Sequence, residues 1–242
     1  LTGLFLYLFL IQLKFDPKLS LLGVFIFLGS RISILSTGAP IVDSLYFLSI
    51  ILIVYFCLTR KTIILTVLTP ILILTKETIV PFLFLPFFIK QINRKLFGVS
   101  LLVSFILFFW VRNTISYWSS NIVESSDPIF YVLINHIKAG WGNITQTYFS
   151  VGGWHGIFST YSIFWIFAAY GAWLSFKKLN TFYQIPHFLL FIIPITFGFT
   201  VLSSNVGRML LGSFPIVIPY TLIGIDYLLF KKNTDHSNRP TS

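Results

Sequence analysis

The ionisable residues that could carry chemistry are few, and most stand where one apolar run ends and the next begins. Lys76 and Glu77 are adjacent, and they separate two short apolar segments. A charge placed among apolar segments is costly, and such residues commonly serve a function. The pair therefore marks either a functional site or the solvated tip of a hairpin, and both interpretations stay open at this stage.

Two arginines are candidates for holding an anionic group of a substrate. Arg208 precedes the last apolar run, and a guanidinium matches the oxygens of a phosphate. Its alternative role is that of an interface arginine whose stem lies along apolar surface. Arg31 lies a few residues inside an apolar run, so we expect it to need an acidic partner, with Asp43 or Glu77 as the nearest candidates.

The remaining candidates are three acids and one histidine. Asp43 opens an apolar run, where an acid most often stabilises a helix N-terminus, and its alternative role is catalytic. Glu124 and Asp127 are closely spaced, and their carboxylate oxygens could share a divalent metal ion. His155 follows two glycines and a tryptophan, and it is a candidate for substrate contact or proton transfer, or for a structural role.

The composition identifies the kind of fold that must position these residues. Of 242 residues, 56% are hydrophobic and 10% are charged, against about 25% charged in a typical soluble domain. The mean hydropathy is +0.87. A chain of this size buries only about three quarters of its surface on folding, so a soluble enzyme cannot hide this much apolar surface. The single cysteine also excludes a scaffold of intrachain disulfides.

Apolar runs of about 20 residues cross a bilayer as helices, and these runs lack the period-two alternation of barrel strands. The sequence therefore predicts an all-α, polytopic transmembrane helix bundle that forms one domain over residues 1–242. About nine segments are expected: 1–13, 19–35, 45–58, 62–75, 78–89, 96–111, 156–175, 185–202 and 209–230. The first residue already lies in an apolar run, so we expect the chain to lack its natural N-terminus.

Two of these segments, 62–75 and 78–89, are short and contain Pro70, Pro81 and Pro86. Proline removes a backbone donor and bends a helix. Irregular backbone is tolerated at membrane depth only where protein or a water-filled cavity covers it. The two segments are therefore expected to be short tilted spans or a re-entrant pair.

The distribution of basic residues predicts the orientation. Counting spans along the chain places 12 of the 17 lysines and arginines on one face. Basic residues gather in cytoplasmic loops, so this face and the tail, about 231–242, are predicted to be cytoplasmic. The net charge of +10 then reflects membrane topology, and no nucleic-acid partner is expected. We expect a multi-pass protein of a bacterial inner membrane.

The opposite, outer face receives the candidate site residues and one long loop, at about 112–155. Within it, Asp127 followed by Pro128 is typical of a helix start. The apolar residues that follow at helical spacing predict a helix lying in the membrane interface. This helix is expected to be either a packing cap or a lid over a lipid-linked substrate.

Three short stretches resemble polytopic glycosyltransferases of the GT-C class: Gly38 to Asp43, Leu74 to Thr78, and Gly207-Arg208 followed by Phe214-Pro215. The resemblance implies sugar transfer from a polyprenyl-phosphate donor at the outer face. In that class the acid that acts as general base lies in the first outer loop, and this chain is expected to begin beyond that loop. Asp43 and Glu77 are the acids at matching stretches, so they are the candidate catalytic residues.

The function favoured by the sequence is therefore a membrane glycosyltransferase whose partners are a polyprenyl-phosphate-linked sugar and membrane lipid. Its expected substrate-binding residues are Lys76, Arg208, Arg31 and His155, and its expected metal ligands are Glu124 and Asp127. The alternative is a transporter or flippase for a lipid-linked or small solute, because interrupted helices suit transporters. A structural subunit is a third interpretation. Phosphate-binding glycine-rich loops and zinc-protease motifs do not occur.

Overall fold

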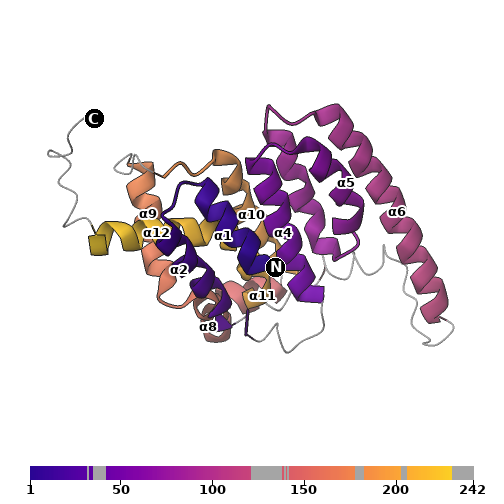
Figure 1. Cartoon of the computed structure of the whole chain (residues 1–242). Coiled ribbons are helices and arrows are strands. Elements are labelled where there is room, and N and C mark those ends of the chain that lie inside the picture. The colour runs from indigo at the N-terminus through magenta and orange to yellow at the C-terminus, as the bar shows by residue number, and fades with distance from the viewer. Residues whose placement is uncertain are drawn as a thin grey trace, which may run out of the picture.

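The computed structural model describes residues 1–31, 33–34, 42–120, 138, 140, 142–177, 183–202 and 206–230. Every regular element within these ranges is a helix (Figure 1), which confirms the all-α class. The helix expected to start at Asp127, the metal ligands proposed at Glu124 and Asp127, and the tail 231–242 lie outside the described residues.

Most helices coincide with the predicted apolar runs, and polar residues mark several of their ends. At one helix start the Asp16 carboxylate accepts a hydrogen bond of 2.8 Å from the backbone N–H of Lys18, and Pro17 occupies the first turn. The helices are α1 (Thr2–Gln12), α2 (Pro17–Leu28), α4 (Val42–Leu58), α5 (Thr62–Leu72), η1 (Glu77–Phe88), α6 (Arg94–Ser120), α8 (Val151–Tyr161), α9 (Phe164–Phe176), η2 (His187–Phe191), α10 (Ile192–Leu202), α11 (Val206–Leu211) and α12 (Phe214–Phe230).

Helix α12 forms the centre of one half of the molecule, where it packs against α9, α2 and α4. Figure 1 shows α4, α5 and α6 side by side in the other half. The Phe214 ring of α12 lies 4.6 Å from the ring of Phe27 in α2, measured between centroids, and 6.4 Å from that of Phe47 in α4. These aromatic contacts join the first, second and last parts of the chain in one core.

Helices α9 and α12 approach each other through paired glycines. A Cβ on Gly171 of α9 would overlap the carbonyl oxygen of Tyr220, and one on Gly224 of α12 would overlap that of Phe167. The Thr221 hydroxyl adds a hydrogen bond of 3.3 Å to the Phe164 carbonyl across the same contact. Small residues that let two helix backbones approach are typical of helix packing within membranes.

The short proline-containing segment forms a 3-10 helix, η1, whose 12 residues include Pro81 and Pro86. A 3-10 helix rises about 2 Å per residue, so η1 extends about 24 Å, against about 18 Å for an α-helix of the same length. Its side chains Ile79, Phe82 and Leu83 are buried. One face of η1 is thus covered by protein, whereas Phe84 and Phe88 are exposed on the helix.

The predicted run 156–175 is not one continuous helix, which corrects the sequence-based expectation. It is divided into α8 and α9, whose axes differ by 72°. Ser162 takes a positive φ of 51° at the corner, and the Trp165 indole N–H donates to the Ile157 carbonyl across it at 2.9 Å. Periodicity could not reveal this corner because the run is apolar on both sides of Ser162.

One described helix region, Arg94–Thr114 of α6, is long and apolar enough to cross a membrane, and the bent pair α8–α9 would add a second. The other apolar helices are shorter than 18 residues, so length alone leaves the nine predicted spans unconfirmed. Large apolar side chains are nonetheless exposed on the surfaces of several helices. On α5 they recur at helical spacing at Ile63, Val67 and Ile71, and on α6 at Val99, Leu102 and Ile106.

The close approach of α9 and α12 at Gly224 leads to a testable prediction about stability. Gly224→Ala should destabilise the protein by about 1–3 kcal/mol, because the new methyl group meets a backbone carbonyl that cannot rotate away. The matched control is Gly198→Ala in α10, where a Cβ meets nothing within 4 Å. That change should be neutral or stabilise by about 0.5–1 kcal/mol. Thermal unfolding in detergent, followed by tryptophan fluorescence, measures both, and equal effects would contradict the tight contact.

Candidate functional site

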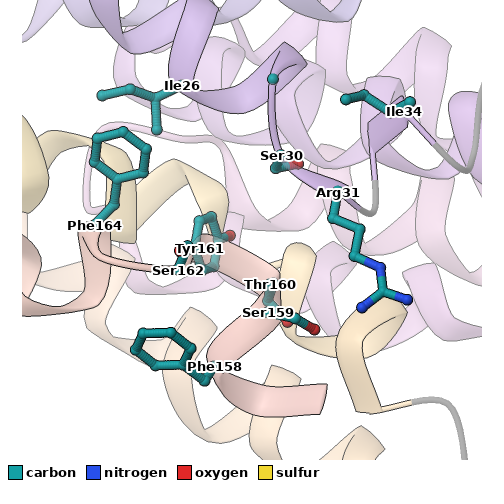
Figure 2. Close-up of a pocket in the computed structure, with 11 residues that line it drawn as sticks. Ile26, Ser30, Arg31, Ile34, Phe158, Ser159, Thr160, Tyr161, Ser162 and Phe164 are labelled. Carbon is teal, nitrogen blue, oxygen red and sulfur yellow. The ribbon is translucent and has the colours of Figure 1, made fainter. Parts of the chain in front are cut away.

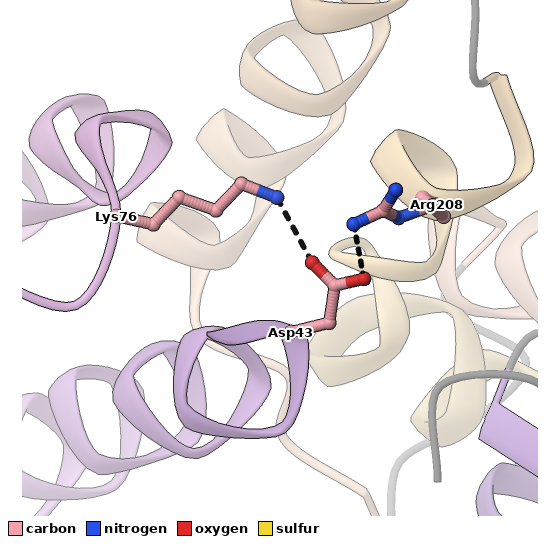
Figure 3. A network of polar contacts seen from close by, with 3 residues as sticks. All are labelled: Asp43, Lys76 and Arg208. Carbon is pink, nitrogen blue, oxygen red and sulfur yellow. Dashed lines mark hydrogen bonds and ion pairs between the residues drawn. The ribbon is translucent and has the colours of Figure 1, made fainter. Parts of the chain in front are cut away.

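Three charged residues from distant parts of the chain meet in one cluster (Figure 3). Asp43 lies in the first turn of α4, Lys76 directly precedes η1, and Arg208 lies in α11. The Lys76 ammonium nitrogen is 3.0 Å from Asp43 Oδ1, and the Arg208 guanidinium pairs with Asp43 Oδ2. Each carboxylate oxygen therefore has a cation of its own.

The carboxylate at the centre of this cluster is buried, whereas its partners reach the surface to different extents. Asp43 is 3% exposed and is the only charged residue among the buried residues that the structure describes. The side chain of Lys76 is 16% exposed and that of Arg208 is 42% exposed. A buried carboxylate requires compensating partners, and here two cations supply them while one keeps an accessible face.

Local structure fixes the position of each member. The Thr75 hydroxyl lies 3.2 Å from the Ser49 hydroxyl of α4, which holds the residue before Lys76 against that helix. Helix α11 is held from the other side, because the Tyr161 hydroxyl of α8 donates to the Leu211 carbonyl at 3.0 Å. Asp43 itself stands at the N-terminal end of α4, where the helix dipole favours a negative charge.

Two hydroxyl groups near the cluster complete the site, and sequence reasoning did not single them out. The Tyr46 ring lies under the Lys76 ammonium, 5.3 Å from ring centroid to nitrogen. The Tyr46 hydroxyl and that of Thr78 are both buried. The available signal was spacing: Tyr46 follows Asp43 by three residues, which places both on one face of a helix.

The other predicted residues lie elsewhere or outside the described residues. The structure shows no pairing of Arg31 with Asp43, because Lys76 and Arg208 already engage both oxygens of that carboxylate. His155 is an exposed residue of α8. The backbone at Glu77 begins η1, and its side chain is outside the description. Among the described residues, no group of three or more His, Cys, Asp or Glu could hold a metal ion.

The described charges of the cluster sum to one positive, so the arrangement suits an anionic ligand. The exposed part of Arg208 can offer N–H donors to such a ligand, and a guanidinium does so in a two-pronged geometry. Asp43 is poorly placed for direct proton transfer, because only 4% of its side chain is exposed and both oxygens face cations. Its geometry is that of a residue that positions Lys76 and Arg208.

The shared carboxylate predicts strong energetic coupling between the two cations. Lys76→Met and Arg208→Met each leave Asp43 with one partner, whereas the double variant leaves a buried charge with none. The double variant should therefore lose about 0.5–3 kcal/mol more free energy of unfolding than the two single losses together. In the Asp43→Asn background this excess should vanish. Chemical unfolding in detergent measures all variants, and additive losses in the native background would refute the coupling.

The chain was compared with protein-family models, with curated proteins and with solved structures. None of the three comparisons found a match. The functional argument is therefore carried by the geometry of Asp43, Lys76 and Arg208, together with the buried hydroxyls of Tyr46 and Thr78. These groups favour the binding of an anion at this cluster.

Proposed function

We propose that the protein is a multi-pass membrane glycosyltransferase, which moves a sugar from a polyprenyl-phosphate donor to an acceptor at the outer membrane face. The observation that carries this proposal is the meeting of Lys76 and Arg208 around the buried carboxylate of Asp43. Two cations held together by one carboxylate retain a net positive charge, and a lipid-linked phosphate is the anion that a membrane supplies.

Membrane embedding is supported by the helix surfaces. Large apolar side chains stay exposed on α5 and α6, and several more do so on α2, α8 and α9. Soluble monomers rarely expose contiguous apolar patches of more than a few hundred Å². Contact with lipid tails accounts for such surfaces. Helices shorter than 18 residues can still belong to a membrane domain when neighbouring helices cover their ends.

The placement of the site at the outer face is supported by which residues meet. The charge count along the chain assigns Asp43, Lys76 and Arg208 to the side opposite the basic loops. Their contacts require the start of α4, the junction of α5 with η1, and α11 to lie at one end of the bundle. A donor whose tail stays in lipid presents its phosphate at such an end.

Within this proposal the residues have different roles. Arg208 and Lys76 hold the donor phosphate, and Asp43 positions both of them. Glu77 is the remaining candidate for the catalytic acid, since its backbone directly follows Lys76 at the start of η1. His155 stays a predicted substrate contact, and Glu124 with Asp127 stays a predicted metal site. Arg31 lines a separate pocket that none of the three cluster residues enters.

A transporter or flippase is the second candidate, and the bent pair α8–α9 is the observation that favours it. Transporters often build their sites from interrupted helices, and the axes of this pair differ by 72°. The charged cluster, however, contains no residue of α8 or α9. Reconstituted vesicles distinguish the two, because a transferase changes the donor chemically whereas a transporter only moves it.

The proposed role of Arg208 predicts a graded loss of transfer. Losing a charge-assisted hydrogen bond costs about 1.5–3 kcal/mol, so Arg208→Ala should lower sugar transfer roughly ten- to a hundredfold. Arg208→Lys should recover only part of the rate, because it keeps the charge and loses the two-pronged geometry. The assay uses membranes that carry the natural full-length protein, with a panel of radiolabelled polyprenyl-phosphate hexoses and pentoses.

The matched control for this series is Arg112→Ala, since Arg112 lies in the C-terminal third of α6, outside the cluster. Its transfer rate should equal that of the unaltered protein at the same expression level. An unchanged rate for Arg208→Ala would show that Arg208 only anchors α11 and would refute the phosphate contact. Movement of intact donor across reconstituted vesicles, without transfer, would favour the transporter.

The orientation gives a separate prediction about the C-terminus. The excess of basic residues on one face predicts that the tail after α12 is cytoplasmic. A phosphatase reporter fused after Ser242 should be inactive, and a fluorescent protein that folds only in the cytoplasm should be bright at the same position. The reverse pattern would overturn the assignment of Asp43, Lys76 and Arg208 to the outer face.

A further inference from the structure

A pocket of about 520 Å³ lies between the end of α2 and the corner that joins α8 to α9 (Figure 2). The α2 side contributes Ile26, Ser30 and Arg31, and the corner contributes Phe158, Ser159 and Ser162, with further residues of the same two segments. This volume falls within the range of small-molecule sites. None of the three charged residues of the Asp43 cluster lines the pocket.

The lining combines one cation, several hydroxyls and apolar side chains. Arg31 extends from the chain just beyond α2 (Figure 2), and hydroxyl groups of Ser30, Ser159 and Ser162 lie along the walls. Phe158 and Phe164 supply apolar surface from the corner. A cation with nearby hydroxyls suits an anionic head, and the adjoining aromatic and aliphatic surface suits a hydrocarbon chain.

The corner that forms one wall is held rigidly. The Tyr161 hydroxyl donates to the Leu211 carbonyl, and the Trp165 indole donates to the Ile157 carbonyl at 2.9 Å. The Ser162 N–H also closes the last turn of α8 by donating to the Phe158 carbonyl at 2.7 Å. These contacts keep the pocket open before a ligand arrives, which lowers the entropic cost of binding.

The charge of Arg31 has no counterpart at this place. Within the described residues, no carboxylate lines the pocket, and no ion pair joins Arg31 to an acid. Arg31 is an exposed residue, so its guanidinium is accessible to an anionic head that enters the pocket from outside. The Asp43 carboxylate, which the sequence offered as a partner, is already held by Lys76 and Arg208.

We infer that this pocket is a binding site for the head of an anionic amphiphile, with its phosphate on Arg31 and the first carbons of its chain on Phe158 and Phe164. The Ser162 hydroxyl donates to one of the remaining phosphate oxygens. The site is separate from the Asp43 cluster, and it does not depend on the proposed transferase activity.

Cysteine protection tests this inference directly. Cys57 is the single cysteine of the chain, and it is 1% exposed, so an introduced cysteine reports alone. Ser159→Cys places a thiol in the pocket, and Asn113→Cys on the exposed face of α6 is the matched control. Protein in neutral maltoside micelles is treated with a water-soluble maleimide while decyl phosphate is added. The labelling of Ser159→Cys should slow at least fivefold, and that of Asn113→Cys should stay unchanged.

Three competitors identify the chemistry that is recognised. Decyltrimethylammonium has the same tail with a positive head, decyl maltoside has a neutral head, and inorganic phosphate has no tail. None should protect Ser159→Cys. Protection by either of the first two would show that any amphiphile fills the pocket, and protection by inorganic phosphate alone would assign the pocket to a free anion. Each of these results would overturn the inference.

The role of Arg31 is tested in the same background. Arg31→Gln should abolish protection by decyl phosphate, and Arg31→Lys should keep part of it, because the charge remains while the planar fork is lost. Ser162→Cys serves as a second reporter at the corner if Ser159→Cys fails to fold. Full protection in the Arg31→Gln variant would refute the site, because the head would then be held without its cation.

Discussion

A buried carboxylate must be compensated wherever it lies, and in this protein that requirement ties three distant segments together. Asp43 is the only charged residue in the buried part of the described chain, and its two oxygens are taken by Lys76 and Arg208. If both cations were lost, the carboxylate would stay as an uncompensated charge in a poorly solvated place. The start of α4, the start of η1 and helix α11 are therefore held at one end of the bundle, where the site forms.

The rest of the fold follows from a second requirement, that polar backbone groups find partners inside the protein. Helices satisfy most of them, and hydroxyls in the apolar helices bond back to the preceding turn, as Thr69 does to the Leu65 carbonyl at 2.6 Å. The 3-10 segment η1 packs one face, with Ile79, Phe82 and Leu83, against the rest of the protein. The glycine contact between α9 and α12 then lets two apolar helices pack backbone to backbone, which is typical of helix packing within membranes.

The charged cluster and the Arg31 pocket are separate, yet one helix contact joins them. Tyr161 lines the pocket, and its hydroxyl binds the Leu211 carbonyl at the end of the helix that carries Arg208. A ligand that shifts the α8–α9 corner would therefore shift α11. The pocket and the cluster therefore both bear on the same short helix, α11.

The amino-acid sequence determines the local part of this structure. Long apolar runs with polar breaks and without period-two alternation favour helices. The all-α class and most helix positions therefore followed from composition and spacing, as did the choice of Lys76 and Arg208 as candidates. The assignment of Asp43, Lys76 and Arg208 to one face led us to expect these residues in one site. Three details required the folded chain: the pairing of Lys76 and Arg208 with the two oxygens of Asp43, the corner at Ser162 and the buried hydroxyl of Tyr46. These details depend on how segments pack in space, which spacing along the chain does not specify. Arg31 illustrates the physical reason. Asp43 was one of the nearest acids to it in the predicted topology, but in the folded chain Lys76 and Arg208 pair with both oxygens of Asp43.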